Sequence, residues 1–226
     1  MKPIAEALLY GILDLGYVQE SNLEAVTAAL LEGGVDVLQL RAKNAQEEEV
    51  EGFARRIISL TESAGIPLLI NDHPQLVPSV GAQGAHVGQD DFEVSDARWR
   101  AGRVLSGDVP YLLIGKSTHS VAQATQAVAQ GADYIGFGPL FATPTKPGRP
   151  AIGLEDIARV HAAVNIPIFC IGGIKRENLE QVLIAGARRV VVVSGILQAE
   201  DLAGYCREVK KVLERRNAEL NEREAI

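Results

Sequence analysis

The chain has 226 residues, of which 47% are hydrophobic, enough to bury the core of one barrel-sized α/β domain or of two small domains. Its formal charge of −7, without any basic stripe, argues against a nucleic-acid partner. No apolar run is long enough to span a membrane, and the N-terminus lacks a signal-peptide layout. Two cysteines without a CxxC motif indicate neither a disulfide framework nor a zinc site. These features favour a soluble, cytoplasmic protein.

Short apolar or β-branched runs recur along the chain, and most are followed by a segment with helical period. We expect eight strands, at residues 8–14, 35–41, 66–72, 84–88, 111–117, 132–138, 166–173 and 189–195. Eight such units fit a closed barrel better than an open sheet, and no dinucleotide fingerprint or Walker motif is present. The pattern predicts an α/β protein, a single-domain TIM (β/α)8 barrel over residues 1–226. The highly charged residues from about 215 to 226 are expected to fray.

A barrel of this kind carries its chemistry at the carboxyl ends of its strands, where polar residues stand out against apolar strand interiors. Gln39 and Arg41 lie two residues apart, so they point to the same side of the second strand and would share the barrel mouth. Arg41 has two interpretations, a ligand contact or a structural pair with a barrel carboxylate. Lys43 follows as a further cation, and Ser117 ends the fifth strand.

Two carboxylates, Asp72 and Asp91, follow neighbouring strands. Asn71 and Asp72 are also typical turn or cap residues, and Asp91 would suit the start of a helix. Because the two strands are neighbours, the carboxylates can converge. Two oxygen ligands, with positions left for water and phosphate, are a common way for proteins to hold Mg²⁺. The sequence therefore predicts a magnesium site at Asp72 and Asp91.

Glycine-rich turns follow the last three strands. Taken alone, the stretch GFGPLFATPTKPG, residues 136–148, is most simply a connector, because Gly and Pro mark turns for conformational reasons. The Gly172–Gly173 and Ser194–Gly195 turns are also ordinary in isolation, yet in barrels this pair of loops is the usual phosphate site. Lys146 adds a cation at the same mouth. The layout predicts two phosphorylated groups bound at once.

His119 follows the fifth strand and is either a general acid–base or a cap of the next helix. We favour the structural role, because no carboxylate partner can be placed beside it. His86, His161 and Trp99 are interpreted as packing or surface residues.

Taken together, the motifs resemble those of the thiamine phosphate synthase family. They are QLRAK (39–43), LINDH (69–73), GAHVGQDD (84–91), IGKSTHS (114–120), GADYIGFGPLFATPTKPG (131–148), IGGI (171–174) and VVVSGI (191–196). The resemblance runs from about Tyr10 to Leu197. It implies a TIM-barrel transferase of thiamine biosynthesis that joins 4-amino-2-methyl-5-hydroxymethylpyrimidine diphosphate to hydroxyethylthiazole phosphate. Mg²⁺ would be required, and thiamine phosphate and pyrophosphate would be the products.

The resemblance also implies roles for single residues. Those matching the diphosphate site are Arg41, Lys43, Asn71 and Lys146, and those matching the metal ligands are Asp72 and Asp91. Gln39 and Ser117 match positions near the pyrimidine ring. Those matching the thiazole phosphate site are Thr143, Thr145, Gly173 and Ser194. The implied catalytic residues are Arg41, Lys43, Ser117 and Lys146. The bond to diphosphate would break first, leaving a carbocation-like pyrimidine, so metal and cations would act without a protein nucleophile.

Three features depart from the family pattern: His73 replaces the usual Arg, GILD replaces ITD at the first strand, and the segment 92–113 is longer than is common. None removes a proposed ligand contact. Beside the other motifs, the loop 136–148 is interpreted as functional, with Gly136 and Gly138 letting the backbone pass close to the ligand.

Two rival functions stay open. A thiazole tautomerase of the same superfamily would use His119 as acid–base, although that branch tends to lack the Asn–Asp pair and the second metal carboxylate. A non-catalytic protein that senses thiamine phosphates is the other, disfavoured by the intact metal and diphosphate positions. The expected partners are small phosphorylated substrates, with no nucleic acid and no membrane, and a homodimer is allowed.

Overall fold

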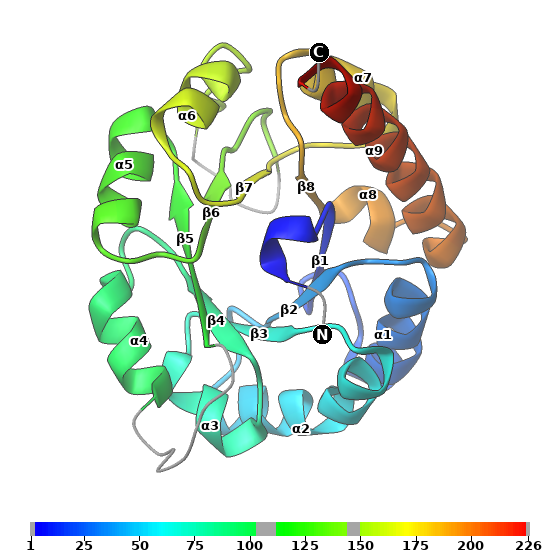
Figure 1. The fold of residues 1–226 in the computed structure, drawn as a ribbon. Helices are drawn as coiled ribbons and strands as arrows, with labels where there is room; N and C mark the ends of the chain where they lie inside the picture. Colours follow the sequence, from blue (N-terminus) through cyan, green and yellow to red (C-terminus); the bar gives the residue numbers. More distant parts are fainter. Residues whose placement is uncertain (1–2, 103–111, 144–149, 225–226) are drawn as a thin grey trace.

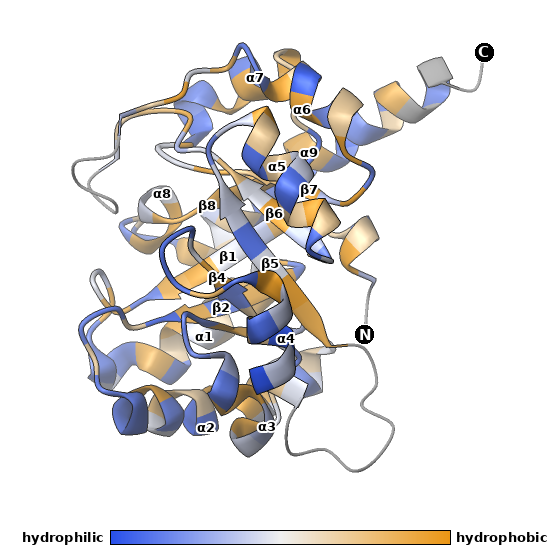
Figure 2. Cartoon of the chain, turned by 90° about the vertical axis from the view of Figure 1, so that its left-hand side faces the viewer, coloured by the Kyte–Doolittle hydropathy of each residue, from blue (hydrophilic) through white to orange (hydrophobic). Residues whose placement is uncertain are grey.

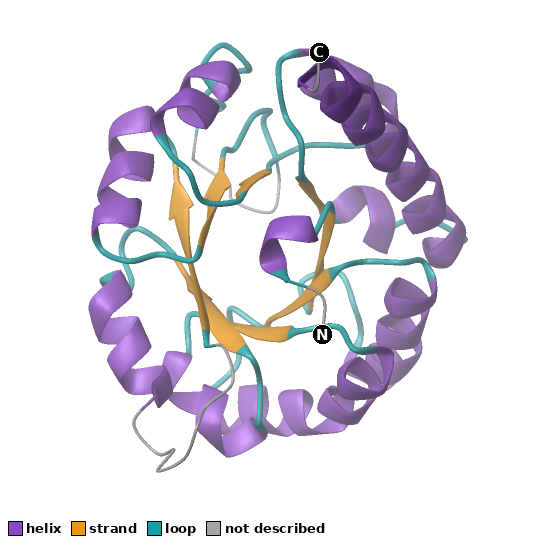
Figure 3. Ribbon diagram, viewed as in Figure 1, coloured by secondary structure: helices purple, strands orange, loops and turns teal. Residues whose placement is uncertain are grey.

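The structure is a computed structural model that describes residues 3–102, 112–143 and 150–224. Eight parallel strands pair in chain order and close into a barrel with helices around its outside (Figures 1 and 3). The expected TIM-barrel fold is confirmed. The strands are β1 (Leu9–Asp14), β2 (Val37–Arg41), β3 (Leu68–Asn71), β4 (Gly84–Val87), β5 (Leu113–Thr118), β6 (Tyr134–Phe137), β7 (Ile168–Cys170) and β8 (Val190–Val192).

The helices follow the strands. The α-helices are α1 (Leu23–Glu32), α2 (Glu47–Ala64), α3 (Val77–Val80), α4 (Val94–Gly102), α5 (Val121–Ala129), α6 (Ile157–Ala163), α7 (Arg176–Ile184), α8 (Ser194–Leu197) and α9 (Leu202–Glu224). Three short 3₁₀ helices are η1 (Ile4–Glu6), η2 (Glu20–Asn22) and η3 (Pro74–Leu76). Among the described residues, no helix is both long and apolar enough to cross a membrane.

Local sequence explains where α2 begins and ends. Its cap residue, Gln46, forms a capping box with Glu49, whose carboxylate accepts the Gln46 backbone N–H at 2.7 Å. The helix ends at Gly65 in the left-handed conformation, with φ of 67°, where glycine carries no side-chain penalty. The chain then enters β3 at the expected place.

Two apolar layers hold the barrel together. The strands carry mostly hydrophobic residues, while hydrophilic residues gather on the outer helices (Figure 2). Inside the barrel, Tyr10, Tyr134 and Phe169 pack edge to face or tilted, with ring centroids 5.3–5.9 Å apart. Gly115 makes room for this cluster, because a Cβ there would lie 2.0 Å from Cζ of Tyr134. Ile4, on η1, is buried in the same cluster.

The C-terminal segment is helical, with α9 continuing to Glu224, and the fraying expected of its end stays a prediction. Its charges pair along the helix, with Arg216 Nη1 at 3.2 Å and Arg215 Nε at 4.0 Å from carboxylate oxygens of Glu219. Asn217 Nδ2 donates to the backbone carbonyl of Arg188 at 3.0 Å, which ties the helix to the barrel. Helical ion pairs and this tether replace the apolar spacing that the segment lacks.

Candidate active site

A cavity of about 810 Å³ opens at the carboxyl ends of the strands, and all eight strands contribute to its lining. It is lined by every predicted site residue within the described part of the chain: Gln39, Arg41, Lys43, Asn71, Asp72, Asp91, Ser117, Thr143, Gly173 and Ser194. Thr145 and Lys146 lie outside the described residues. The topology therefore brings the predicted residues to one mouth, while their roles stay predictions.

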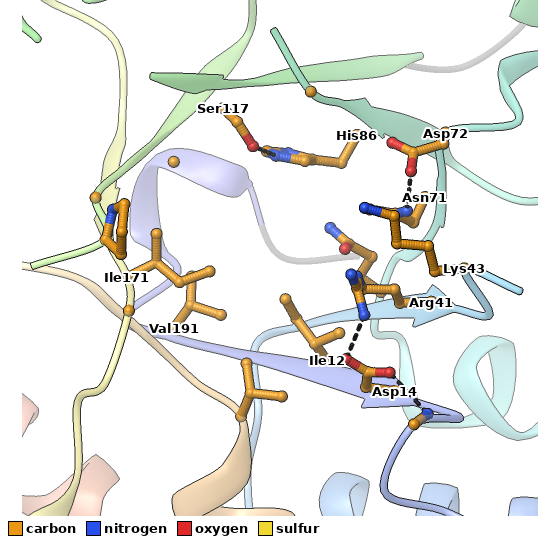
Figure 4. Close-up of a pocket in the computed structure, with 18 of the residues that line it drawn as sticks. Ile12, Asp14, Arg41, Lys43, Asn71, Asp72, His86, Ser117, Ile171 and Val191 are labelled. Carbon is orange, nitrogen blue, oxygen red and sulfur yellow. Dashed lines mark hydrogen bonds and ion pairs between the residues drawn. The ribbon is translucent and has the colours of Figure 1, made fainter. Parts of the chain in front are cut away.

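Arg41 is held at the mouth by Asp14, a residue that the sequence analysis did not single out. The two residues face each other across β1 and β2, and Nη1 of Arg41 donates to Oδ2 of Asp14 at 2.6 Å (Figure 4). Asp14 is only 2% exposed, and its other oxygen accepts the N–H of Gly16 at 2.9 Å. A guanidinium carries five N–H donors, so Arg41 keeps further donors for a ligand. Arg41 thus pairs with a barrel carboxylate, as its structural interpretation predicted, and this pairing is compatible with a ligand contact.

The two predicted metal carboxylates lie together. Burial and the neighbouring Asp91 carboxylate raise the pKa of Asp72 to about 6, against the amide of Asn71 and the charge of Arg41. Nδ2 of Asn71 donates to Oδ2 of Asp72 at 2.6 Å (Figure 4). The backbone of Asp72 is left-handed, with φ of 61°, a conformation that is uncommon outside glycine and concentrated at functional sites. Two converging carboxylates favour a proton or a cation between them.

The loop that carries Asp91 is fastened from below by Lys116, a second residue that was missed. Its ammonium donates to the carbonyls of Gly88 at 2.8 Å and Phe92 at 2.6 Å, one on each side of Asp91. The side chain is 4% exposed, and burial lowers the pKa of Lys116 against the opposing acidic charge of the same loop. Nε2 of Gln89 adds a hydrogen bond to the carbonyl of Ser117 at 2.5 Å. The sequence signal that could have identified Lys116 was a lysine within the apolar run IGKS.

His86 lines the cavity, so its interpretation as a packing or surface residue is wrong. Its Nε2 lies 2.9 Å from Oγ of Ser117 (Figure 4). Its Nδ1 lies 3.0 Å from the Tyr134 hydroxyl. The Tyr134 hydroxyl in turn lies 3.0 Å from that of Tyr10, which accepts from Nε2 of Gln39 at 2.7 Å. A polar chain therefore joins the two residues predicted to lie near the pyrimidine ring.

The other two interpreted residues behave as expected. Trp99 is 57% exposed on α4. His161 is half-buried on α6, away from the cavity lining, and its Nε2 has no hydrogen-bond partner among the described residues. Burial and the nearby Arg188 and Arg189 lower the pKa of His161 to about 4, so it stays neutral at physiological pH.

His119 lies in the cavity lining, but it does not cap α5. The cap is Ser120, whose side chain accepts the Gln123 N–H at 3.2 Å. Nδ1 of His119 contacts the carbonyl of Gly138, and its backbone N–H donates to Oε1 of Gln123 at 2.7 Å. The imidazole therefore ties β5 to the loop after β6, a structural role different from the one expected.

Glycines shape the loops around the predicted phosphate site. Gly172 and Gly173 have φ of 100° and 67°, and a Cβ on Gly172 would lie 2.4 Å from Pro139. A Cβ on Gly138 would lie 2.0 Å from the carbonyl oxygen of Ile171, so this glycine serves the contact with β7 as well as facing the cavity. Within the described residues, the backbone N–H groups of Gly173 and Ser194 have no hydrogen-bond partner. Two unpaired N–H groups at the mouth are suited to an anion.

The chain is similar to known proteins both in sequence and in fold. A family model described as thiamine monophosphate synthase matches residues 9–196. The thiamine-phosphate synthase of Halalkalibacterium halodurans is 41% identical over 209 residues, covering 92% of this chain and 96% of its own. That of Thermus thermophilus is 43% identical over 189 residues, covering 82% and 86%. The solved thiamine phosphate pyrophosphorylase of Pyrococcus furiosus superposes with a TM-score of 0.81 at 32% identity, covering 94% and 98%.

The fold and the cavity define a TIM barrel with an open cavity at its strand ends. The family match and the identities over most of the chain show that it belongs to the thiamine monophosphate synthase family.

The fastening of the Asp91 loop can be tested directly. Lys116→Met removes two hydrogen bonds from a charged donor, each worth roughly 1.5–3 kcal/mol, so amide hydrogen exchange in residues 88–92 should accelerate by at least about tenfold. Mass spectrometry of the exchanged peptides measures this. Lys211→Met, an exposed position on α9, is the matched control. Equal exchange rates for residues 88–92 in Lys116→Met and the unmodified protein would show that Lys116 does not hold the loop.

Proposed function

We propose that the protein condenses 4-amino-2-methyl-5-hydroxymethylpyrimidine diphosphate with hydroxyethylthiazole phosphate, giving thiamine phosphate and pyrophosphate. The observation that carries the proposal is one cavity that has two regions suited to anions. Cations and a carboxylate pair gather at β2, β3 and the loop after β4. The turns after β7 and β8 carry the N–H groups of Gly173 and Ser194, which have no hydrogen-bond partner in the described part of the chain. The relatives' names fit this layout.

The first region suits a diphosphate with a magnesium ion. Mg²⁺ usually takes one or two protein carboxylates and fills its other positions with water and substrate phosphate oxygens. Asp72 and Asp91 supply two such carboxylates, and no larger cluster of His, Cys, Asp or Glu competes for a metal within the described chain. Arg41 and Lys43 would contact the remaining phosphate oxygens, and Asn71 would orient Asp72. Lys146, outside the described residues, is proposed for the same diphosphate.

The second region suits the thiazole phosphate. The N–H groups of Gly173 and Ser194 would donate to its oxygens, and the hydroxyls of Thr143 and Thr145 are proposed to add further donors. Gln39 and Ser117 line the same cavity, and we place the pyrimidine ring against them. This arrangement would bring the ring's exocyclic carbon to the thiazole nitrogen and convert a bimolecular encounter into a positioned one.

The chemistry then needs charge stabilisation more than a nucleophile. When bound, Mg²⁺ would neutralise charge that develops on the departing pyrophosphate. Arg41, preorganised by Asp14, would act on the same charge without reorganising during the reaction, and Lys43 would add a second cation. The apolar wall of Ile12, Ile171 and Val191 limits water at the carbon where positive charge develops (Figure 4). These features support a dissociative, carbocation-like mechanism.

The tautomerase alternative is weaker, because the Asn71–Asp72 pair and Asp91 have no role in such a reaction. A cytoplasmic location and a homodimer remain predictions.

The direct test of the proposed function is turnover. Purified protein supplied with both phosphorylated precursors and Mg²⁺ should release pyrophosphate and form thiamine phosphate in equal amounts, measured by a coupled pyrophosphate assay and by chromatography. No product with both fresh substrates would contradict the synthase function. Isomerisation of a thiazole carboxylate phosphate, abolished by His119→Ala, would instead establish the tautomerase.

The metal site is tested by Asp91→Ala. Loss of a carboxylate ligand should raise the Mg²⁺ concentration for half-maximal activity by about 10- to 100-fold, the range seen when metal-site support is removed. Titration of initial rates with Mg²⁺ measures it. Glu93→Ala is the matched control, because it removes the same charge just after the same loop, where its carboxylate contacts Gln130. Unchanged Mg²⁺ dependence in Asp91→Ala would remove this residue from the metal site.

A further inference from the structure

A line of hydrogen bonds crosses the barrel interior from Gln39 on β2 to Ser117 on β5. It joins in order Gln39 Nε2, the Tyr10 hydroxyl, the Tyr134 hydroxyl, His86 Nδ1, His86 Nε2 and Ser117 Oγ, with separations of 2.7–3.0 Å at each contact. Tyr10 and Tyr134 are 2% and 0% exposed. Water therefore cannot replace a missing hydrogen-bond partner of either tyrosine, so each tyrosine hydroxyl proton needs an acceptor within the line.

The direction of the line is fixed at Tyr10. Its hydroxyl oxygen faces the amide nitrogen of Gln39, which can only donate. Within the described residues, the only acceptor for the Tyr10 proton is the hydroxyl oxygen of Tyr134. Tyr10 therefore accepts from Gln39 and donates to Tyr134, because the reverse direction would leave a buried O–H without an acceptor.

The same reasoning sets the direction of the hydrogen bonds from Tyr134 to His86 and from His86 to Ser117. Tyr134 accepts from Tyr10, so its own proton goes to Nδ1 of His86. His86 must then carry its proton on Nε2 and donate it to Oγ of Ser117. A doubly protonated imidazole would leave the Tyr134 proton unpaired. Ser117 thus accepts from inside the barrel, and its own hydroxyl proton is left to point into the cavity.

We propose that Tyr10, Tyr134 and His86 are positioning residues that fix the Ser117 hydroxyl as a donor and the Gln39 carbonyl oxygen as an acceptor toward the ligand. Such a site selects a flat heteroaromatic ring that offers one unprotonated ring nitrogen and one amino group. This inference rests on the proposed function and refines it, because an aminopyrimidine has both groups.

Packing keeps the line in place. Phe169 contacts both tyrosine rings edge-on, with centroids 5.3 Å from Tyr10 and 5.7 Å from Tyr134. The ring of Tyr134 occupies the space where Gly115 lacks a Cβ. Burial raises the pKa of both phenols well above the usual value, so each keeps its proton across the working pH range. The direction of the line is therefore a built-in property of the ligand-free barrel.

The tautomer of His86 is the direct readout, measured by ¹⁵N NMR of protein labelled in its histidine rings. His86 signals are assigned by their loss in His86→Gln. The ligand-free protein should show Nε2 protonated and Nδ1 unprotonated. Protonation on Nδ1 in the unmodified protein would overturn the proposal without any variant being needed.

Two tyrosine variants test the cause. Tyr134→Phe removes the donor to Nδ1 and should give a mixture of both His86 tautomers. Tyr10→Phe removes a similar buried hydroxyl one step earlier but leaves Tyr134 free to donate, so the Nε2-protonated form should persist. The same tautomer in both variants would show that Tyr134 does not set the direction. Far-ultraviolet circular dichroism confirms that each variant is folded.

A kinetic split completes the test. Tyr134→Phe should raise KM for the pyrimidine diphosphate by about tenfold, as expected for one weakened hydrogen bond, and leave KM for the thiazole phosphate unchanged. An equal rise in both KM values would show that Tyr134 acts only through general packing, and it would overturn the proposal. Because the NMR readout uses ligand-free protein, absence of turnover with the expected tautomer would reject the proposed function alone.

Discussion

Closure of eight parallel strands is the constraint on which the rest of the molecule depends. Because every strand runs the same way, the side chains that follow each strand meet at one mouth, however far apart they lie in the sequence. Gln39, Asp91 and Ser194 share a cavity for this reason alone. The opposite arrangement, an open sheet, would have spread the same residues along an edge.

Several carboxylates line this mouth. Three of the carboxylates that line it each accept a hydrogen bond: Asp14 from Arg41, Asp72 from Asn71, and Asp91 from the backbone N–H of Gly88. Buried Lys116 lies beneath the acidic loop and holds its backbone rather than its carboxylates. The carboxylates therefore remain directed at the cavity. A cation placed between Asp72 and Asp91 would replace the proton that their proximity favours.

Much of this could be predicted from the sequence, because strand ends are marked by a change from apolar to polar residues. The predicted strands showed which residues end them and therefore lie at the mouth. Asp72 and Asp91 were predicted to converge because they follow neighbouring strands. Side chains that act from inside the barrel were missed. Tyr10 and Tyr134 resemble any buried aromatic residue in a sequence, and their hydroxyl contacts depend on ring positions set by Gly115 and Phe169.

Other differences have similar causes. His86 alternates with apolar neighbours on β4, a pattern that suits a packed residue as well as one that faces the cavity, and only barrel closure decides between them. Gly138 was assigned to ligand approach, whereas its contact with Ile171 requires two loops to be placed in space. The charged end of α9 has weak apolar spacing, and the contacts that it makes in the structure are ion pairs and a hydrogen bond from Asn217 to the carbonyl of Arg188.

We propose that the carboxylate pair and the cations of the mouth form one metal–diphosphate site. This proposal can be tested by a crystal structure of the protein with Mg²⁺ and pyrophosphate. We expect a metal ion bound by oxygens of Asp72 and Asp91, with the pyrophosphate against Arg41 and Lys43 and the Arg41–Asp14 ion pair retained. Pyrophosphate bound only at the Gly173 and Ser194 turns, with no metal at the two aspartates, would contradict it.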